Sequence, residues 1–158
     1  MMKLFLSQPM TGYSDDEIHL ERLSMLTVVN RQVNLAYENI LKVDPLLRVL
    51  MNNFGNVDDQ HFEVIDQIHW NARYKKVHPN CTMKDLLLED LKLMMEGEDT
   101  FVVFHPRYKK SVGCKIEHKI CAEYGIPYFY LTKDWRLVSE DEKAVMKRLK
   151  KKTKEDVL

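Results

Sequence analysis

Short apolar runs alternate with longer amphipathic stretches along this chain of 158 residues. Residues 3–7 (KLFLS) are an apolar run of strand length, ended by the proline and glycine of QPMTG. Ser14, with Glu17 three residues later, has the pattern of a capping box, and apolar residues then recur at helical spacing as far as residue 41. The pattern predicts a buried strand followed by a long helix.

The second half of the chain continues this alternation. Thr82 is expected to cap a helix that begins at residue 83 and ends at Gly97. The β-branched and aromatic run at residues 100–106 (TFVVFHP) predicts a strand. Residues 111–125 predict a helix that ends in glycine, and residues 126–131 (IPYFYL) predict another strand.

The succession of strands and helices predicts an α/β fold: a single-domain Rossmann-like, flavodoxin-like parallel sheet flanked by helices. We expect the domain to span residues 1–150, a length that one hydrophobic core can serve. Residues 139–158 have a capped start and a basic end, so we expect a last helix whose residues 151–158 form a solvated basic tail.

The middle of the chain has a weaker pattern. Residues 45–51 (PLLRVLM) are the candidate for a second strand. Residues 58–74 have the spacing of an amphipathic helix. The side of that helix expected to be apolar consists of Phe62, Ile65, Ile68 and His69.

Composition narrows the classes of function. Lysine and arginine number 24, as do aspartate and glutamate, so no net field favours nucleic acid or an anionic membrane. The first ten residues are too weakly apolar for a signal sequence, and we expect a cytoplasmic protein without membrane contact. Three cysteines without a CxxC spacing suggest reduced thiols, and no ligand set suggests a metal or cofactor.

Two loops follow predicted strands and precede predicted helices, which is where parallel sheets bind ligands. The first, residues 7–17, offers the hydroxyls of Ser7 and Thr11, and Gly12 permits close backbone approach. The second covers residues 105–117. The free N–H groups of a helix N-terminus suit a phosphate or carboxylate in either loop. The alternative is that both are ordinary turns.

Glu117 is the strongest candidate for chemistry. At about 100° per residue, an apolar arc is defined by Ile116, Ile120, Tyr124 and Cys121, and Glu117 falls inside it. Gly113, one turn earlier, leaves the carboxylate uncovered. A carboxylate at the floor of a hollow is either costly or functional. The alternative places Glu117 at the edge of the face, paired with a lysine.

Other polar residues are candidates for the same crevice. Asp99 precedes the strand at residues 100–106, and Asp90 lies on the preceding helix. Each either points into the crevice or caps a helix in solvent. His105, at the end of the strand, either touches substrate or serves the fold. Cys114 lacks the paired histidine that thiol catalysis needs.

Two blocks of the sequence, LFLSQPMTG and HPRYKKSVGCKIEHKICAEYGIPYFYL, resemble the nucleoside 2-deoxyribosyltransferase-like superfamily. The resemblance is closest to its small phage and bacterial branch, whose members have a Ser-x-Pro-Met-x-Gly loop and an aromatic-x-x-Ser-x-Gly-x-x-x-Glu block. The matching residues here are Ser7, Pro9, Met10 and Gly12 in the first block and Tyr108, Ser111, Gly113 and Glu117 in the second.

The resemblance implies that Glu117 attacks the anomeric carbon of a deoxynucleoside and forms a glycosyl-enzyme ester. Asp99 or Asp90 would then protonate the leaving base, and Ser111 would bind a 5′-phosphate with the first loop. Tyr13 is a possible substitute for an aromatic residue of the transferases. The implied protein is a homo-oligomer that needs neither metal nor cofactor.

The sequence therefore predicts cleavage or transfer of the N-glycosidic bond of a 2-deoxynucleoside or its 5′-monophosphate. A non-catalytic nucleotide-binding or sensing module that uses the same crevice is the first alternative. A structural or interaction domain with an incidental cleft is the second.

Overall fold

The computed structural model describes residues 2–43, 62–97 and 99–157, and its fold is α/β. The sheet has five strands in the order β2-β1-β3-β4-β5. Strand β1 (Met2–Ser7) lies between β2 (Phe62–Val64) and β3 (Thr100–Phe104) and is parallel to both. Strand β4 (Tyr128–Leu131) is parallel to β3, and the short β5 (Leu137–Val138) closes the edge in antiparallel orientation.

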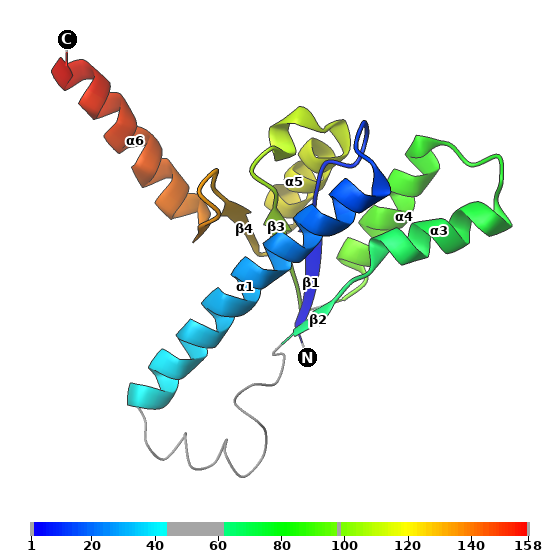
Figure 1. Ribbon diagram of the computed structural model, residues 1–158, viewed down its shortest axis with the longest axis horizontal. Coiled ribbons are helices and arrows are strands. Elements are labelled where there is room, and N and C mark those ends of the chain that lie inside the picture. Colours follow the sequence, from blue (N-terminus) through cyan, green and yellow to red (C-terminus); the bar gives the residue numbers. More distant parts are fainter. Residues whose placement is uncertain (1, 44–61, 98, 158) are drawn as a thin grey trace.

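Helices cover both faces of this sheet (Figure 1). Helix α1 (Asp15–Val43) crosses one face, while α4 (Met83–Met95) and α5 (Val112–Tyr124) pack on the other. Helix α3 (Gln67–Val77) lies beside α4. Helix α6 (Glu140–Val157) projects away from the body and carries the C-terminus.

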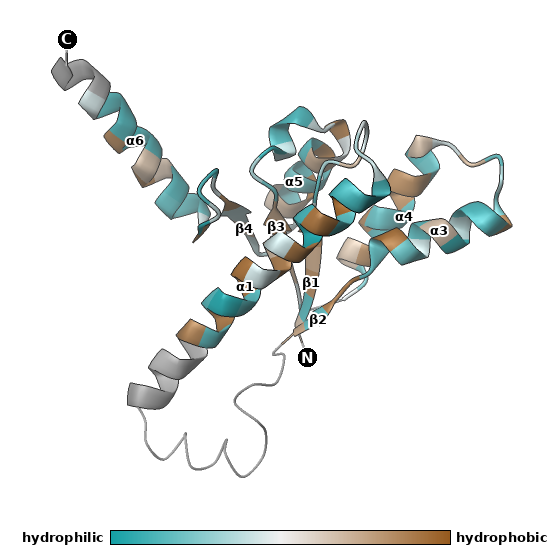
Figure 2. Cartoon of the chain, viewed as in Figure 1, coloured by the Kyte–Doolittle hydropathy of each residue, from teal (hydrophilic) through white to brown (hydrophobic). Residues whose placement is uncertain are grey.

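The alternation of side chains along the strands produces two apolar layers. Leu4 and Leu6 of β1 face α1 and pack with its Met25 and Val29. Phe5 faces the opposite way, into a cluster with residues of α4 and α5. Strand β1 is brown in Figure 2 because both of its faces are apolar, as expected for a central parallel strand.

The predicted strands at residues 3–7, 100–106 and 126–131 are confirmed, and so are the helices that flank them. Thr82 caps α4 in a reciprocal capping box with Asp85. Gly125 ends α5 with φ +67°, a left-handed conformation that glycine adopts at little cost. Local signals were sufficient at these positions.

The prediction for the middle of the chain is partly wrong. Phe62 belongs to strand β2 rather than to a helix, and α3 begins only at Gln67, after Asp66 accepts a hydrogen bond from the backbone N–H of His69. A short apolar run fits a strand or a helix equally well, and here pairing with β1 decides for the strand. The predicted strand at residues 45–51 lies outside the described residues.

Helix α6 extends to Val157, so the expected tail at residues 151–158 is helical as far as the structure describes it. Residues 140–153 of this helix are mostly hydrophilic (Figure 2). Among the described residues, no helix combines the length and apolar character needed to cross a bilayer.

Candidate active site

The carboxyl ends of β1 and β3 form the topological switch point of the sheet. The chain leaves β1 toward β2 on one side and returns to β3 on the other. In open α/β sheets the crevice at such a point is the usual ligand site. Both loops that the sequence singled out follow these two strands.

Glu117 lies at this point and faces inward, as the helix geometry predicted. Its side chain is 6% exposed. The hydroxyl of Ser7, at the end of β1, donates a hydrogen bond to Glu117 Oε1 over 2.9 Å. The apolar arc was only partly right, because Ile116 and Tyr124 are exposed, whereas Cys121 is buried on one face of the helix with Cys114 and Glu117.

Burial dominates the electrostatics of Glu117. Loss of hydration raises its pKa to about 8; the charge of Asp90 also raises it, and the Ser7 hydrogen bond lowers it. Among the described residues, the carboxyl of Glu117 is hydrogen-bonded to Ser7 and has no lysine partner. The alternative, a pairing with lysine, is therefore not observed. Burial therefore favours the protonated form of Glu117 at neutral pH.

Asp90, on α4, is the second carboxyl of the site. Asn71 Nδ2 of α3 donates a hydrogen bond to Asp90 Oδ1 over 3.0 Å. Burial raises the pKa of Asp90 to about 6, against the Asn71 hydrogen bond and the charge of Arg22, both of which lower it. The negative charge of Asp90 in turn raises the pKa of Glu117. We call Glu117 and Asp90 the carboxyl pair.

Arg22 of α1 connects this region to the edge of the sheet. Its Nη2 atom donates to the carbonyl oxygen of Ile65 over 2.8 Å and to Gln67 Oε1 over 2.7 Å. Gln67, 1% exposed, donates in turn to the carbonyl oxygen of Leu6 over 2.6 Å. Sequence reasoning missed Arg22, Gln67 and Asn71 because no local pattern distinguishes them; the contacts of α1 and α3 around the end of β1 bring them together.

Asp99 does not reach the site. It is exposed and directly precedes Thr100, at the amino end of β3, where its carbonyl oxygen accepts a hydrogen bond from Lys3. Glu117 lies near the opposite, carboxyl end of the strands. The expectation that Asp99 points into the same crevice as Asp90 is wrong, because a parallel strand separates its two ends by its whole length.

His105 is held on the α1 side of the sheet. It is 2% exposed, its Nδ1 accepts a hydrogen bond from the backbone N–H of Arg107 over 3.0 Å, and its Nε2 lies 2.9 Å from Glu21 Oε2. Burial is the main cause that lowers the pKa of His105. Arg107 also forms an ion pair with Glu21. These contacts support the structural alternative for His105.

The first loop is anchored by the second. The guanidinium of Arg107 stacks over the ring of Tyr13, 5.0 Å from its centre. Pro9 is buried and Met10 half-buried. Gly12, at the exposed bend, has φ +87°, which a residue with a side chain rarely adopts. The ring of Tyr13 therefore packs against Arg107.

Ser111 is the N-cap residue of α5. Its Oγ accepts a hydrogen bond from the backbone N–H of Cys114 over 3.3 Å, which leaves the hydroxyl hydrogen to donate. Gly113 follows one residue into the helix. A Cβ atom there would meet Leu87 and the Ser111 hydroxyl only at 3.7 and 3.8 Å, so packing within the chain does not require glycine at this position.

Tyr108 lies in a separate polar region. With His118, Tyr128 and Tyr130 it forms a group of rings over Phe104, which we call the tyrosine cluster. The Tyr130 hydroxyl lies 2.5 Å from His118 Nε2 and also donates to Glu140 of α6. Lys143 Nζ donates to the Tyr108 hydroxyl over 3.0 Å.

The buried thiols are poor nucleophiles. Burial and the charge of Glu117 raise the pKa of Cys114 to about 11 and that of Cys121 to about 12. In the described part of the chain, no group of three or more histidine, cysteine, aspartate or glutamate residues is placed to hold a metal ion.

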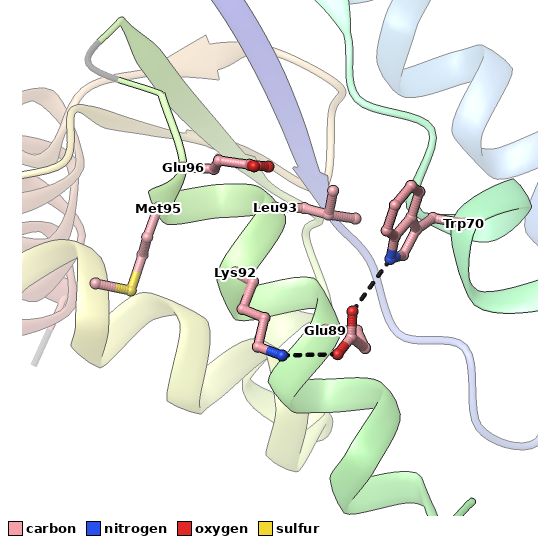
Figure 3. A pocket seen from close by; sticks show the side chains of 6 residues that line it. All are labelled: Trp70, Glu89, Lys92, Leu93, Met95 and Glu96. Atoms are coloured by element: carbon pink, nitrogen blue, oxygen red, sulfur yellow. Dashed lines mark hydrogen bonds and ion pairs between the residues drawn. The ribbon is translucent and has the colours of Figure 1, made fainter. Parts of the chain in front are cut away.

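A shallow hollow of about 390 Å³ lies elsewhere, between α3 and α4 (Figure 3). Trp70 Nε1 donates to Glu89 Oε2 over 3.2 Å, and Lys92 pairs with Glu89 over 2.9 Å. The remaining lining residues are Leu93, Met95 and Glu96. None of these residues belongs to the carboxyl pair or touches it through a hydrogen bond, so the hollow carries no support for chemistry at Glu117.

Comparisons of the chain with protein-family models, with curated proteins and with solved structures gave no match.

Proposed function

We propose that the protein cleaves or transfers the N-glycosidic bond of a 2-deoxynucleoside or its 5′-monophosphate, with Glu117 as nucleophile and Asp90 as general acid. The observation that carries the proposal is the carboxyl pair itself, a buried Glu117 and a half-buried Asp90 whose pKa values are both raised, with the charge of Asp90 adding to the shift of Glu117. The two sequence blocks that resemble the deoxyribosyltransferase-like superfamily supply the reaction class.

In the first step a Glu117 carboxylate oxygen forms a bond to C1′ while the bond from C1′ to the base nitrogen breaks. The bonding electrons leave with the base, and Asp90 gives that base a proton. In the second step water, or another base, attacks C1′ and displaces Glu117. The ionised Asp90 takes the proton of the incoming nucleophile, which restores both carboxyls.

Ser7 and Ser111 are assigned to positioning and binding. The Ser7 hydroxyl fixes Oε1 of Glu117 and lowers its pKa, which favours the nucleophilic form. Ser111 offers its hydroxyl hydrogen at the N-terminus of α5, where a 5′-phosphate is favourably bound. Replacing Ser111 by alanine should therefore weaken monophosphates more than nucleosides, and equal losses would remove the phosphate from the proposal.

The productive form has Glu117 ionised and Asp90 protonated. With pKa values of about 8 and about 6, that form is a minor one, most populated between the two values. We expect a bell-shaped dependence of kcat/KM on pH, with its limbs near these values. The cationic sugar of the transition state favours an ionised Glu117, which offsets the cost of its burial.

The test is to incubate the protein with deoxynucleosides and their monophosphates and to measure free base by chromatography. Glu117→Gln keeps the shape of the side chain and can keep the Ser7 hydrogen bond, and it should lower base release by a factor of about 10³ or more. Glu123→Gln, on the exposed side of the same helix, is the matched control and should release base at the wild-type rate.

Chemical rescue separates the nucleophile from the acid. In Glu117→Ala, added azide should restore base release and give a deoxyribosyl azide, because azide occupies the space of the carboxylate and attacks C1′ directly. Rescue of Asp90→Ala and not of Glu117→Ala would reverse the two roles.

A non-catalytic nucleotide-binding module is favoured by one observation. Glu117 is 6% exposed, and burial favours its protonated form at neutral pH, which suits a buried hydrogen-bond donor better than a nucleophile. Thermal stabilisation by nucleotides without any release of base would select this function over catalysis.

The proposal includes a homo-oligomer. Leu20 and Leu23 of α1 are 65% and 61% exposed, and large exposed apolar side chains on one helix suit a contact with a second copy. Light scattering during size-exclusion chromatography measures the mass, and a monomer at micromolar concentration would contradict this part of the proposal.

A further inference from the structure

Two buried polar atoms beside Asp90 have no hydrogen-bond partner among the described residues. They are Arg22 Nη1 and Asn71 Oδ1. The other polar end of each side chain is fully engaged: Arg22 Nη2 binds two oxygens at the end of β2 and the start of α3, and Asn71 Nδ2 binds Asp90. The two free atoms therefore belong to side chains that are already held in place.

Their orientation follows from those bonds. Because Arg22 is fixed at Nη2 by the oxygens of Ile65 and Gln67, its planar guanidinium has little freedom to turn Nη1 elsewhere. Because Asp90 requires a donor, the nitrogen of the Asn71 amide faces Asp90 and the oxygen faces away. An unmet buried polar atom costs about 1–3 kcal/mol, so native proteins contain few of them.

The chemistry of the two atoms defines a complementary ligand. A guanidinium nitrogen only donates, and an amide oxygen only accepts. The matching edge carries an acceptor and an N–H group. A carbonyl oxygen projects from the ring and has two lone pairs, so it is a better acceptor for the N–H groups of a guanidinium nitrogen than a ring nitrogen with one lone pair. A carbonyl beside an N–H is the lactam edge of uracil, thymine, hypoxanthine and guanine.

We propose that Arg22 and Asn71 recognise the lactam edge of the leaving base, Arg22 Nη1 donating to its carbonyl oxygen and Asn71 Oδ1 accepting from its N–H. The proposal rests on the proposed function, because it places the base beside Asp90. Because both atoms are buried, the base reaches them only when the side chains that cover them move apart. Adenine and cytosine, which present a ring nitrogen and an amino group, are bound less well.

Binding of free bases tests this assignment without any turnover. Calorimetric titration of the full chain with the bases methylated at the glycosidic nitrogen (9-methylhypoxanthine, 1-methyluracil, 9-methyladenine and 1-methylcytosine) should show the two lactam bases bound more tightly than the two amino bases. Asn71→Ala and Arg22→Lys should each weaken the lactam bases by about 10-fold or more, and the amino bases by less than about 3-fold. Arg22→Lys keeps the positive charge near Asp90 and removes only the planar fork.

The matched control is Arg73→Lys, an exposed arginine on the same helix as Asn71, which should change no affinity. Circular dichroism and the Tm of each variant establish folding, and if Arg22→Lys does not fold, Asn71→Ala carries the test alone. Losses of equal size for all four bases, or no loss, would overturn the assignment.

The outcomes for the two proposals are separable. Selective binding of lactam bases without any release of base from nucleosides would remove catalysis and leave the recognition standing. If base is released, and Asn71→Ala leaves unchanged the ratio of the release rates for lactam and amino substrates, catalysis would stand and the recognition would be removed. Each result is read from the same four bases and their deoxynucleosides.

Discussion

The carboxyl pair and the tyrosine cluster include two adjacent residues of α5, Glu117 and His118, and differ in how their polar groups are hydrogen-bonded. Glu117 has a hydrogen bond from Ser7, the like charge of Asp90 nearby, and a pKa raised by burial. His118, the next residue, contacts the hydroxyl of Tyr130, which also reaches Glu140. Glu117 is buried with one hydrogen-bond partner, whereas the hydroxyl of Tyr130 has two.

The difference indicates what each region is for. A polar network with its partners in place rigidifies a structure, and this one connects β4 to the first turn of α6. A buried carboxyl with a single hydrogen bond destabilises the fold, and such groups persist where a ligand or a reaction uses them. We therefore expect substitutions in the carboxyl pair to affect chemistry, and those in the tyrosine cluster to affect stability.

The largest effect is expected for Asp90→Asn. Loss of the general acid should lower kcat for base release by about 10²- to 10⁴-fold and remove the fall of the rate at alkaline pH, because only the ionisation of Glu117 then shapes the pH profile. Steady-state rates between pH 5 and 9 measure both. Substrates whose base leaves without protonation should lose much less, and an equal loss for them would argue against a role in proton transfer.

Stability should depend on pH through Glu117. Its pKa is about 8 in the folded protein against an ordinary value of 4.5, so between these values the folded state holds a proton that the unfolded state has released. The contribution is fully present below about pH 4.5 and is lost as pH rises through about 8, by an amount on the order of 5 kcal/mol.

Urea unfolding of the wild type and of Glu117→Gln isolates this contribution. The free energy of unfolding of the wild type should fall between pH 6 and 9, a window above the pKa of Asp90, while that of Glu117→Gln should stay nearly level. Parallel curves for the two proteins would show that Glu117 ionises like an exposed carboxyl.

A smaller effect, on stability alone, is expected for Tyr130→Phe. The substitution removes the hydroxyl that contacts His118 and donates to Glu140, and should lower the free energy of unfolding by about 1–3 kcal/mol. Base release at a temperature where the variant is folded should match the wild type. Tyr124→Phe, at a tyrosine that is 68% exposed on the same helix, is the control for the loss of a phenolic hydroxyl.

The smallest effect is expected for Asp99→Asn. The side chain is exposed at the amino end of β3, so the free energy of unfolding should change by less than about 0.5 kcal/mol. The rate of base release should stay at the wild-type value. A loss of activity comparable to that of Asp90→Asn would mean that the two ends of the sheet are coupled, and would contradict the separation seen here.

Local patterns in the sequence were enough for the fold class, the main strands and helices, the caps at Thr82 and Gly125, and the inward direction of Glu117. These features depend on residues a few positions apart, where periodicity, capping and glycine conformations act. The same reasoning failed at Phe62, where a short apolar run became a strand because an edge of β1 was available to pair with it.

Only the tertiary structure decided which residues share the site. Ser7 and Glu117 are 110 positions apart, Arg22 and Gln67 are 45 apart, and Asn71 and Asp90 are 19 apart. Hydrogen bonds over such separations, and the loss of hydration that raises the pKa of Glu117, depend on packing that no local pattern encodes. The sequence by itself determined that a carboxylate faces the end of the sheet; the packing of α1, α3 and α4 determined that Asp90, and not Asp99, accompanies it.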